Sequence, residues 1–108
     1  MLETEENPHP VMEVVRFTLN KSLPDQQLAA LCSETETLLR AQSGFLARWL
    51  IRSETGLVTD LVLWRSRAEA EIAAATVTTD PAFAAYMAAI DLSSVQMGHD
   101  RLIWSMQA

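Results

Sequence analysis

The order of strand-type and helix-type patterns is the feature that most limits how this 108-residue chain can fold. β-Branched and aromatic runs predict strands at residues 11–19, 45–53, 57–64 and 95–106. Apolar residues at helical spacing fill the two longer intervals between them. The order is therefore strand, helix, strand, strand, helix, strand. Its simplest packing is an α+β, ferredoxin-like βαββαβ antiparallel sheet with both helices on one face.

Both helices carry start signals. Ser22, Pro24 and Asp25 predict the beginning of the first helix, with Ser22 as the capping hydroxyl. Ser66 and Glu69 have the spacing of a capping box at the beginning of the second.

Glycines and one further cap mark the remaining boundaries. Gly44 predicts a left-handed cap after the first helix, and Gly56 a hairpin turn between the second and third strands. Asp80 predicts a cap for a further helical segment after the TTDP interruption. The first helix is expected to bury one stripe, made of Leu28, Leu31, Cys32, Thr35, Leu38 and Leu39.

Composition limits domain number, location and partners. Residues 1–10 predict a flexible N-terminal tail, and residues 11–108 a single domain. The net charge of −6 and the scattered Lys and Arg residues argue against nucleic acid and anionic membranes as partners. The opening residues lack a signal-peptide pattern, and no apolar run approaches the ~20 residues of a membrane span, so a cytoplasmic location is expected.

The strands are apolar on both faces, which predicts a homodimer. In the third strand Leu61 and Leu63 alternate with Val62 and Trp64. In the second strand the alternation places Phe45, Trp49 and Ile51 opposite Leu46 and Leu50. Two helices can cover only one face, so a second copy packed sheet against sheet is the economical cover for the other.

Asp60 lies inside the apolar third strand, on the same face as Trp64. A carboxylate there needs a partner or water, because burying an unpaired charge is costly. In one interpretation it pairs structurally with Arg16, Arg48 or Arg52. In a second, Asp60 and Trp64 are the polar anchor and the stacking wall of a small-molecule pocket. In a third, Asp60 is a general base.

Other candidates for that pocket come from separate segments. His99, in the last predicted strand, could act with Asp60 as a catalytic acid–base pair if both face one cavity, or be a structural histidine. Arg48 and Tyr86 could contact substrate, or could lie on the surface and in the core respectively. Cys32, the only cysteine, is expected to be a core residue, and His9 belongs to the tail. No histidine or cysteine spacing indicates a metal site.

The motifs SGFLAR (residues 43–48) and VLWRSRAEAE (residues 62–71), together with the strand order, resemble the dimeric α/β-barrel superfamily and its antibiotic biosynthesis monooxygenase-like domains. In that family's cofactor-independent monooxygenases an asparagine stands four residues before the strand-end tryptophan. Asp60 and Trp64 occupy those positions. The family's tyrosine falls at Ala70, and the histidine of the haem-degrading branch falls at Ala74. The resemblance therefore implies neither haem nor another cofactor.

These observations predict a small-molecule-binding dimeric α/β barrel. The resemblance implies a cofactor-independent monooxygenase-like enzyme that acts on a small aromatic or polyketide-like compound. The missing tyrosine and the absence of a complete catalytic set favour an alternative, a non-catalytic ligand-binding or stress-associated barrel. A structural subunit with a filled cavity is a third possibility.

Overall fold

The computed structural model describes residues 9–108. The predicted tail at residues 1–10 thus lies largely outside the described residues. The strands are β1 (Val11–Phe17), β2 (Phe45–Arg52), β3 (Val58–Trp64) and β4 (Gln96–Arg101). The helices are α1 (Asp25–Ser33), α2 (Glu36–Arg40), α3 (Arg67–Val77) and α4 (Ala84–Ala89), with short 3-10 turns η2 (Pro81–Phe83) and η3 (Leu92–Ser94).

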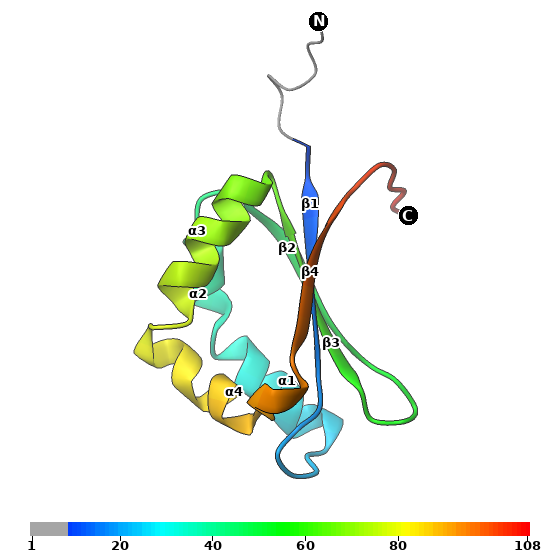
Figure 1. Cartoon of the computed structure of the whole chain (residues 1–108), viewed down its shortest axis with the longest axis vertical. Helices are drawn as coiled ribbons and strands as arrows, with labels where there is room; N and C mark the ends of the chain where they lie inside the picture. The colour runs from blue at the N-terminus through cyan, green and yellow to red at the C-terminus, as the bar shows by residue number, and fades with distance from the viewer. Residues whose placement is uncertain (1–8) are drawn as a thin grey trace, which may run out of the picture.

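The four strands form one antiparallel sheet in the order β2-β3-β1-β4. The helices of residues 9–108 all lie on one side of this sheet, as Figure 1 shows. This is the ferredoxin-like arrangement predicted from the order of elements. Strands β1 and β3 lie in the centre, so side chains on their helix-facing sides are the most deeply enclosed.

Most of the predicted local signals are present. Gly44 and Gly56 both adopt positive φ, at 87° and 96°, which glycine tolerates without steric cost. Ser66 caps α3 by accepting the backbone N–H of Glu69, and Asp80 caps η2 by accepting that of Ala82. Ser22 was wrongly predicted as a cap: α1 begins at Asp25, and its N-cap is Pro24, which makes no capping side-chain bond.

The first helical segment is broken at Thr35, where the sequence predicted one continuous helix. The Thr35 hydroxyl donates to the Cys32 carbonyl at 2.6 Å, and the side chain is fully buried. Such a side-chain bond competes with the helical backbone pattern. The break separates α1 from α2, and Leu28, Thr35 and Leu39 of the predicted stripe are buried.

A β-bulge in β2 corrects the predicted alternation of that strand. Phe45 pairs with Trp64 and Ala47 with Leu63, so the register shifts between these two pairs. An extra residue in a strand reverses which face the preceding side chains occupy. Phe45 therefore lies on the helix side, packed edge-to-face on Trp64 at 5.9 Å between centroids, and not beside Trp49 as predicted.

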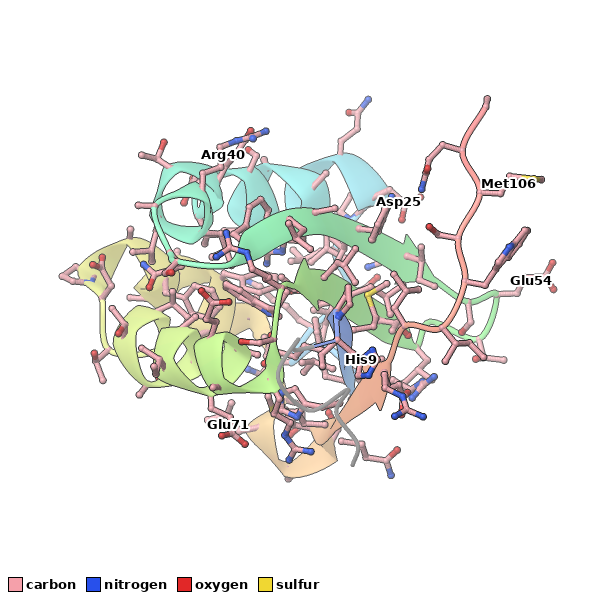
Figure 2. All side chains as sticks on the ribbon, turned by 90° about the horizontal axis from the view of Figure 1, so that it is seen from above. His9, Asp25, Arg40, Glu54, Glu71 and Met106 are labelled. Carbon is pink, nitrogen blue, oxygen red and sulfur yellow. The ribbon has the colours of Figure 1, made fainter. Side chains whose placement is uncertain are left out.

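The last strand is shorter than predicted. Strand β4 ends at Arg101, which pairs with Val11 at the very beginning of β1. Beyond that pair β1 offers no further ladder partner, and the Leu102 N–H bonds to the Pro10 carbonyl at 2.8 Å. The segment that follows exposes Ile103, Trp104 and Met106. This C-terminal segment lies on the other side of the sheet from α3 in Figures 1 and 2. In Figure 2 the label Met106 marks the segment and the label Glu71 marks α3.

The helix-free face of the sheet is largely apolar. The strand register places on it Met12, Val14, Trp49, Ile51, Leu61 and Leu63. Trp49 is 48% exposed and Ile51 53% exposed. The predicted two-sided apolar pattern is therefore present, and one of its faces is uncovered in the single chain.

Candidate functional site

A cavity of about 400 Å³ lies between the sheet and the helices. Apolar side chains from β1, β3, α3 and α4 make up most of its wall. Six polar or amphipathic side chains interrupt that wall: Glu13, Arg48, Asp60, Trp64, Thr78 and Tyr86. Exposed Leu92, Val95 and Met97 line its outer part, beside β4.

Asp60 is buried and held by the protein. Arg48 donates from Nε to Oδ1 at 3.0 Å and from Nη2 to Oδ2 at 2.7 Å. The Tyr86 hydroxyl donates to Oδ2 at 2.7 Å. A forked arginine and a phenol thus use both carboxylate oxygens. Of the three arginines considered as partners, the structure selects Arg48.

The other two arginines are placed elsewhere. Arg52 pairs with Asp25 at 2.6 Å, across an exposed surface. Arg16 is exposed on the helix-free face.

Arg48 extends the Asp60 network to the first helix. Its Nη1 donates to the Thr35 hydroxyl at 2.6 Å, which in turn donates to the Cys32 carbonyl. Its guanidinium carbon also lies 5.5 Å from the centroid of the Tyr86 ring. The break between α1 and α2 therefore places the Thr35 hydroxyl where it can accept from Nη1 of the buried Arg48. Without Thr35 this nitrogen would lack that partner.

Tyr86 is fixed on both its ring and its hydroxyl. Its ring packs edge-to-face on Phe17 and Phe83, with centroids 6.1 and 5.4 Å away. Burial, followed by the negative charge of Asp60, raises the pKa of the Tyr86 phenol well above its usual range. Tyr86 consequently stays a neutral hydrogen-bond donor to Asp60.

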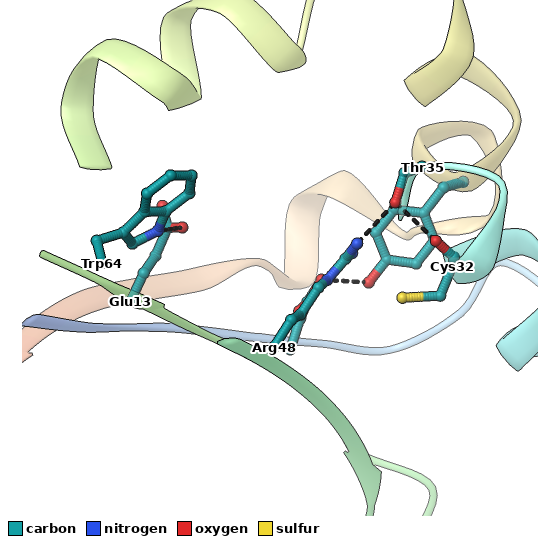
Figure 3. Close-up of polar contacts among 7 residues, drawn as sticks. Glu13, Cys32, Thr35, Arg48 and Trp64 are labelled. Carbon is teal, nitrogen blue, oxygen red and sulfur yellow. Dashed lines mark hydrogen bonds and ion pairs between the residues drawn. The ribbon is translucent and has the colours of Figure 1, made fainter. Parts of the chain in front are cut away.

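Glu13 is a second acid in this cavity, and the sequence reasoning missed it. It is only 8% exposed. Trp64 Nε1 donates to its Oε1 at 3.1 Å, as Figure 3 shows. Burial raises the pKa of this carboxyl above the ordinary value of 4.5, although the Trp64 bond acts in the opposite direction. The available signal was its phase: Glu13 shares one face of its strand with the apolar residues Val11, Val15 and Phe17, as Asp60 shares one with Val62 and Trp64.

His99 lies beside Glu13, and Asp60 is not its partner. The register pairs Glu13 with His99 across β1 and β4, so both side chains share the helix side of the sheet. His99 Nε2 is 3.8 Å from Glu13 Oε2. That nitrogen is buried and has no hydrogen-bond partner in the part of the chain that the structure describes. The predicted Asp60–His99 pair is therefore wrong: Asp60 bonds to Arg48 and Tyr86, and His99 lies beside Glu13.

The remaining candidates have no part in this cavity. Cys32 is partly buried, and burial raises the pKa of its thiol, which disfavours the reactive thiolate. It lines a separate groove of about 510 Å³ on the outer side of β2. His9 is exposed. Within residues 9–108 no three His, Cys, Asp or Glu side chains come together in a way that could hold a metal ion. In the same range no helix is long and apolar enough to cross a membrane.

Comparison with known proteins identifies the fold. No family model matches the sequence, and no curated protein sequence matches it. Among solved structures, it resembles a presumed antibiotic biosynthesis monooxygenase from Bordetella bronchiseptica, with a TM-score of 0.72, 13% identity, and coverage of 89% of this chain and 99% of that one.

Two other structural relatives are SnoaB and Rv0793. SnoaB, a cofactor-independent oxygenase from Streptomyces nogalater, gives a TM-score of 0.59 at 17% identity, covering 92% of this chain and 96% of its own. Rv0793 from Mycobacterium tuberculosis gives 0.62 at 22% identity, covering 91% and 99%. The chain therefore has the fold of the antibiotic biosynthesis monooxygenase-like proteins, as its motifs predicted.

Proposed function

We propose that this chain binds a small aromatic or polyketide-like compound in the cavity between sheet and helices, and that it is a monooxygenase-like enzyme needing no cofactor. The observation that carries the proposal is the cavity itself. Its volume of about 400 Å³ falls in the range of small-ligand sites. Its wall is apolar, with a few polar groups converging on one side, which is the usual composition of such sites. The oxygenase relative SnoaB supports the class of reaction.

The residues divide into two roles under this proposal. Trp64 and Tyr86 offer aromatic surface to a bound ring, and Arg48 lies beside them. Under this proposal Asp60 positions Arg48 and Tyr86 and does not take a proton from substrate, because the Arg48 fork and Tyr86 already take three of the roughly four acceptor positions of its carboxylate. A general base needs a free lone pair within hydrogen-bond reach of the proton it removes.

Filling the cavity tests the proposal. Ala74 lines the cavity from α3, whereas its neighbour Ala75 is exposed. We expect Ala74→Phe to abolish oxygen uptake with an anthrone and the rise in melting temperature that a bound anthrone causes. Ala75→Phe should leave both unchanged. Equal behaviour of the two variants, or wild-type protein indifferent to anthrones and phenols, would contradict the proposal.

A non-catalytic binding protein is the second candidate. It is favoured by Ala70, which stands where the resembling monooxygenases carry a tyrosine, and by the saturated Asp60. Native mass spectrometry of freshly purified protein separates the two candidates. A copurified aromatic that survives aerobic incubation unchanged supports binding alone, and conversion to an oxidised product supports the enzyme.

We also propose that two copies pack through their helix-free sheet faces. The support is the uncovered apolar set that includes Trp49 and Ile51, because monomeric proteins seldom expose a contiguous apolar patch of this kind. Light scattering at micromolar concentration should give the mass of two chains. Trp49→Lys should give one chain, whereas Ile72→Lys on the exposed side of α3 should remain paired. A one-chain mass for the wild type would contradict the dimer.

A further inference from the structure

Glu13 and His99 leave hydrogen-bonding capacity unused inside the protein. The His99 side chain is about nine-tenths buried, and its Nε2 makes no hydrogen bond to any of residues 9–108. The facing Oε2 of Glu13 is 3.8 Å away, which is too long for a direct hydrogen bond. Buried polar atoms in native proteins are nearly always paired. An orphaned nitrogen beside a half-used carboxylate therefore needs a physical explanation.

One oxygen atom from outside the protein would complete both groups, once a side-chain shift opens the buried Nε2 of His99. Hydrogen-bonded oxygen lies about 2.8 Å from a donor or acceptor. An atom at that distance from both Glu13 Oε2 and His99 Nε2 makes an angle of roughly 85° between them, which a hydroxyl group can satisfy as donor to one and acceptor from the other. Asp60 has less capacity left, since Arg48 and Tyr86 take three of the roughly four acceptor positions of its carboxylate.

We propose that Glu13 and His99 form the proton-accepting site of the cavity and take the acidic hydroxyl of a phenolic or enolic ligand. This inference rests on the proposed function, because it assigns the polar end of the same ligand. Glu13 lines the cavity wall, and so does Met97, two residues before His99 on the same strand, whereas His99 itself lies beside Glu13 outside the lining. A ring lying between Trp64 and Ala74 would thus bring a hydroxyl to Glu13, at the edge of the Glu13–His99 gap.

The proton transfer balances without another reactant. The ligand O–H bond breaks, its proton goes to Oε2 of Glu13, and the electron pair stays on the ligand oxygen. Nε2–H of His99 then donates to the new anion. The total charge of site and ligand is unchanged, and the carboxylate and the ligand anion are never both present, which avoids a like-charge clash.

The surroundings of Glu13 favour this step. Trp64 holds Oε1, which leaves Oε2 toward His99. Burial raises the pKa of Glu13, so its carboxylate is a stronger base than an exposed one. The charged groups that act on Glu13 come from the other three strands: Arg48 on β2, Asp60 on β3 and His99 on β4. Arg48 and Asp60 neutralise each other as an ion pair, which leaves His99 as the specific partner of Glu13.

The test uses 4-nitrophenol, whose anion absorbs visible light, and 4-nitroanisole, which has the same ring but no acidic proton. Below the pH at which free nitrophenol ionises, wild-type protein should bind it as the coloured anion. Glu13→Gln should bind nitrophenol in the neutral form and at least about tenfold more weakly, as for a lost hydrogen bond to a charged group. Its affinity for nitroanisole should stay within about twofold of the wild-type value, because that probe never used the carboxylate.

A matched histidine pair keeps the test independent of any folding defect in Glu13→Gln. His99→Gln should lose the coloured band, and His9→Gln, changed at an exposed histidine, should keep it. The inference is overturned if wild-type protein binds both probes but holds nitrophenol neutral, or if Glu13→Gln retains the coloured band. If neither probe binds wild-type protein, the proposed aromatic-binding function fails as well, so the two failures are distinguishable.

Discussion

Two buried acids face the same cavity, and they differ in what holds them. Asp60 accepts three hydrogen bonds, all from Arg48 and Tyr86. Glu13 accepts one, from Trp64, and its other oxygen faces the unpaired nitrogen of His99. Figure 3 shows the Trp64–Glu13 contact well apart from the group around Arg48 and Thr35.

The difference teaches that burial of an acid does not by itself mark a reactive group. A buried charge with a complete set of donors is a structural ion pair, because its lone pairs are used and its desolvation is compensated. A buried acid with an incomplete set keeps a lone pair for another proton or ligand. The Asp60 network is thus expected to govern stability, and Glu13 to govern chemistry.

The largest expected effect is on stability, and it comes from breaking the Asp60 pair. Arg48→Met keeps most of the side-chain volume but leaves the Asp60 carboxylate with Tyr86 alone. Removing one partner of a buried ion pair costs about 3–5 kcal/mol. That is a large share of the roughly 5–15 kcal/mol by which a domain is stable. The free energy of unfolding in urea measures the loss.

Arg52→Met is the matched control. Arg52 also lies on β2 and pairs with an acid, but its partner, Asp25 of α1, is 86% exposed. An exposed pair contributes about 0–1 kcal/mol. Equal losses of unfolding free energy in the two variants would show that the buried Arg48–Asp60 pair stabilises the protein no more than the exposed Arg52–Asp25 pair.

A smaller loss is expected from Tyr86→Phe, which removes only the phenol donor to Asp60. A hydrogen bond to a charged group contributes about 1.5–3 kcal/mol. The pKa of Tyr86 is raised above 10.0 in the folded protein, so its stabilising effect is complete below pH 10 and is lost as the pH rises further. The advantage of wild-type protein over Tyr86→Phe in urea should therefore shrink above pH 10.

The Tyr86–Asp60 hydrogen bond can also be tested in wild-type protein by titrating the tyrosine. Tyr86 is the only tyrosine, so the ultraviolet absorbance of tyrosinate reports this residue alone. It should not form around pH 10 while the chain stays folded. Tyrosinate that appears at the ordinary pH without unfolding would contradict the buried Tyr86–Asp60 bond.

The fold could be predicted from the sequence because the signals for it are local. The order of strands and helices along the chain followed from the spacing of apolar residues. Gly44 and Gly56 mark turns through their positive φ, and Ser66 marks a helix start through its capping side chain. The bulge at Phe45 and the end of β4 at Arg101 were not predictable in this way. Both depend on which residues stand opposite on the neighbouring strand.

Only part of the candidate site could be predicted, because its other contacts also depend on which residues stand opposite on neighbouring strands. An arginine partner for Asp60 was predicted, with Arg48 as one of three possibilities, because an acid in an apolar strand demands partners. Tyr86 was predicted only as a substrate contact or a core residue, and its bond to Asp60 was not. Glu13 obeys the same rule as Asp60, but the β-branched pattern of the first strand predicts only a strand and not the role of its acid. Its pairing with His99 joins residues 86 positions apart and rests on the β1–β4 register, which no short-range pattern specifies.

The smallest expected effect falls on the pH dependence of stability, and it concerns Glu13. The pKa of Glu13 is raised above 4.5 in the folded protein, chiefly by burial. The folded state thus holds this proton more tightly than the unfolded state does. The contribution of Glu13 to the free energy of unfolding is then complete below pH 4.5 and is lost as the pH rises through the raised pKa. Glu13→Gln cannot lose that proton, so its stability relative to wild-type protein should increase from pH 4 to pH 7. Urea unfolding at these pH values measures the difference.

Asp60→Asn, which removes an acceptor from Arg48, should be less stable than wild-type protein at pH 7. If Glu13→Gln behaves like Asp60→Asn at that pH, Glu13 is a second structural ion-pair partner, and the distinction between the two acids fails.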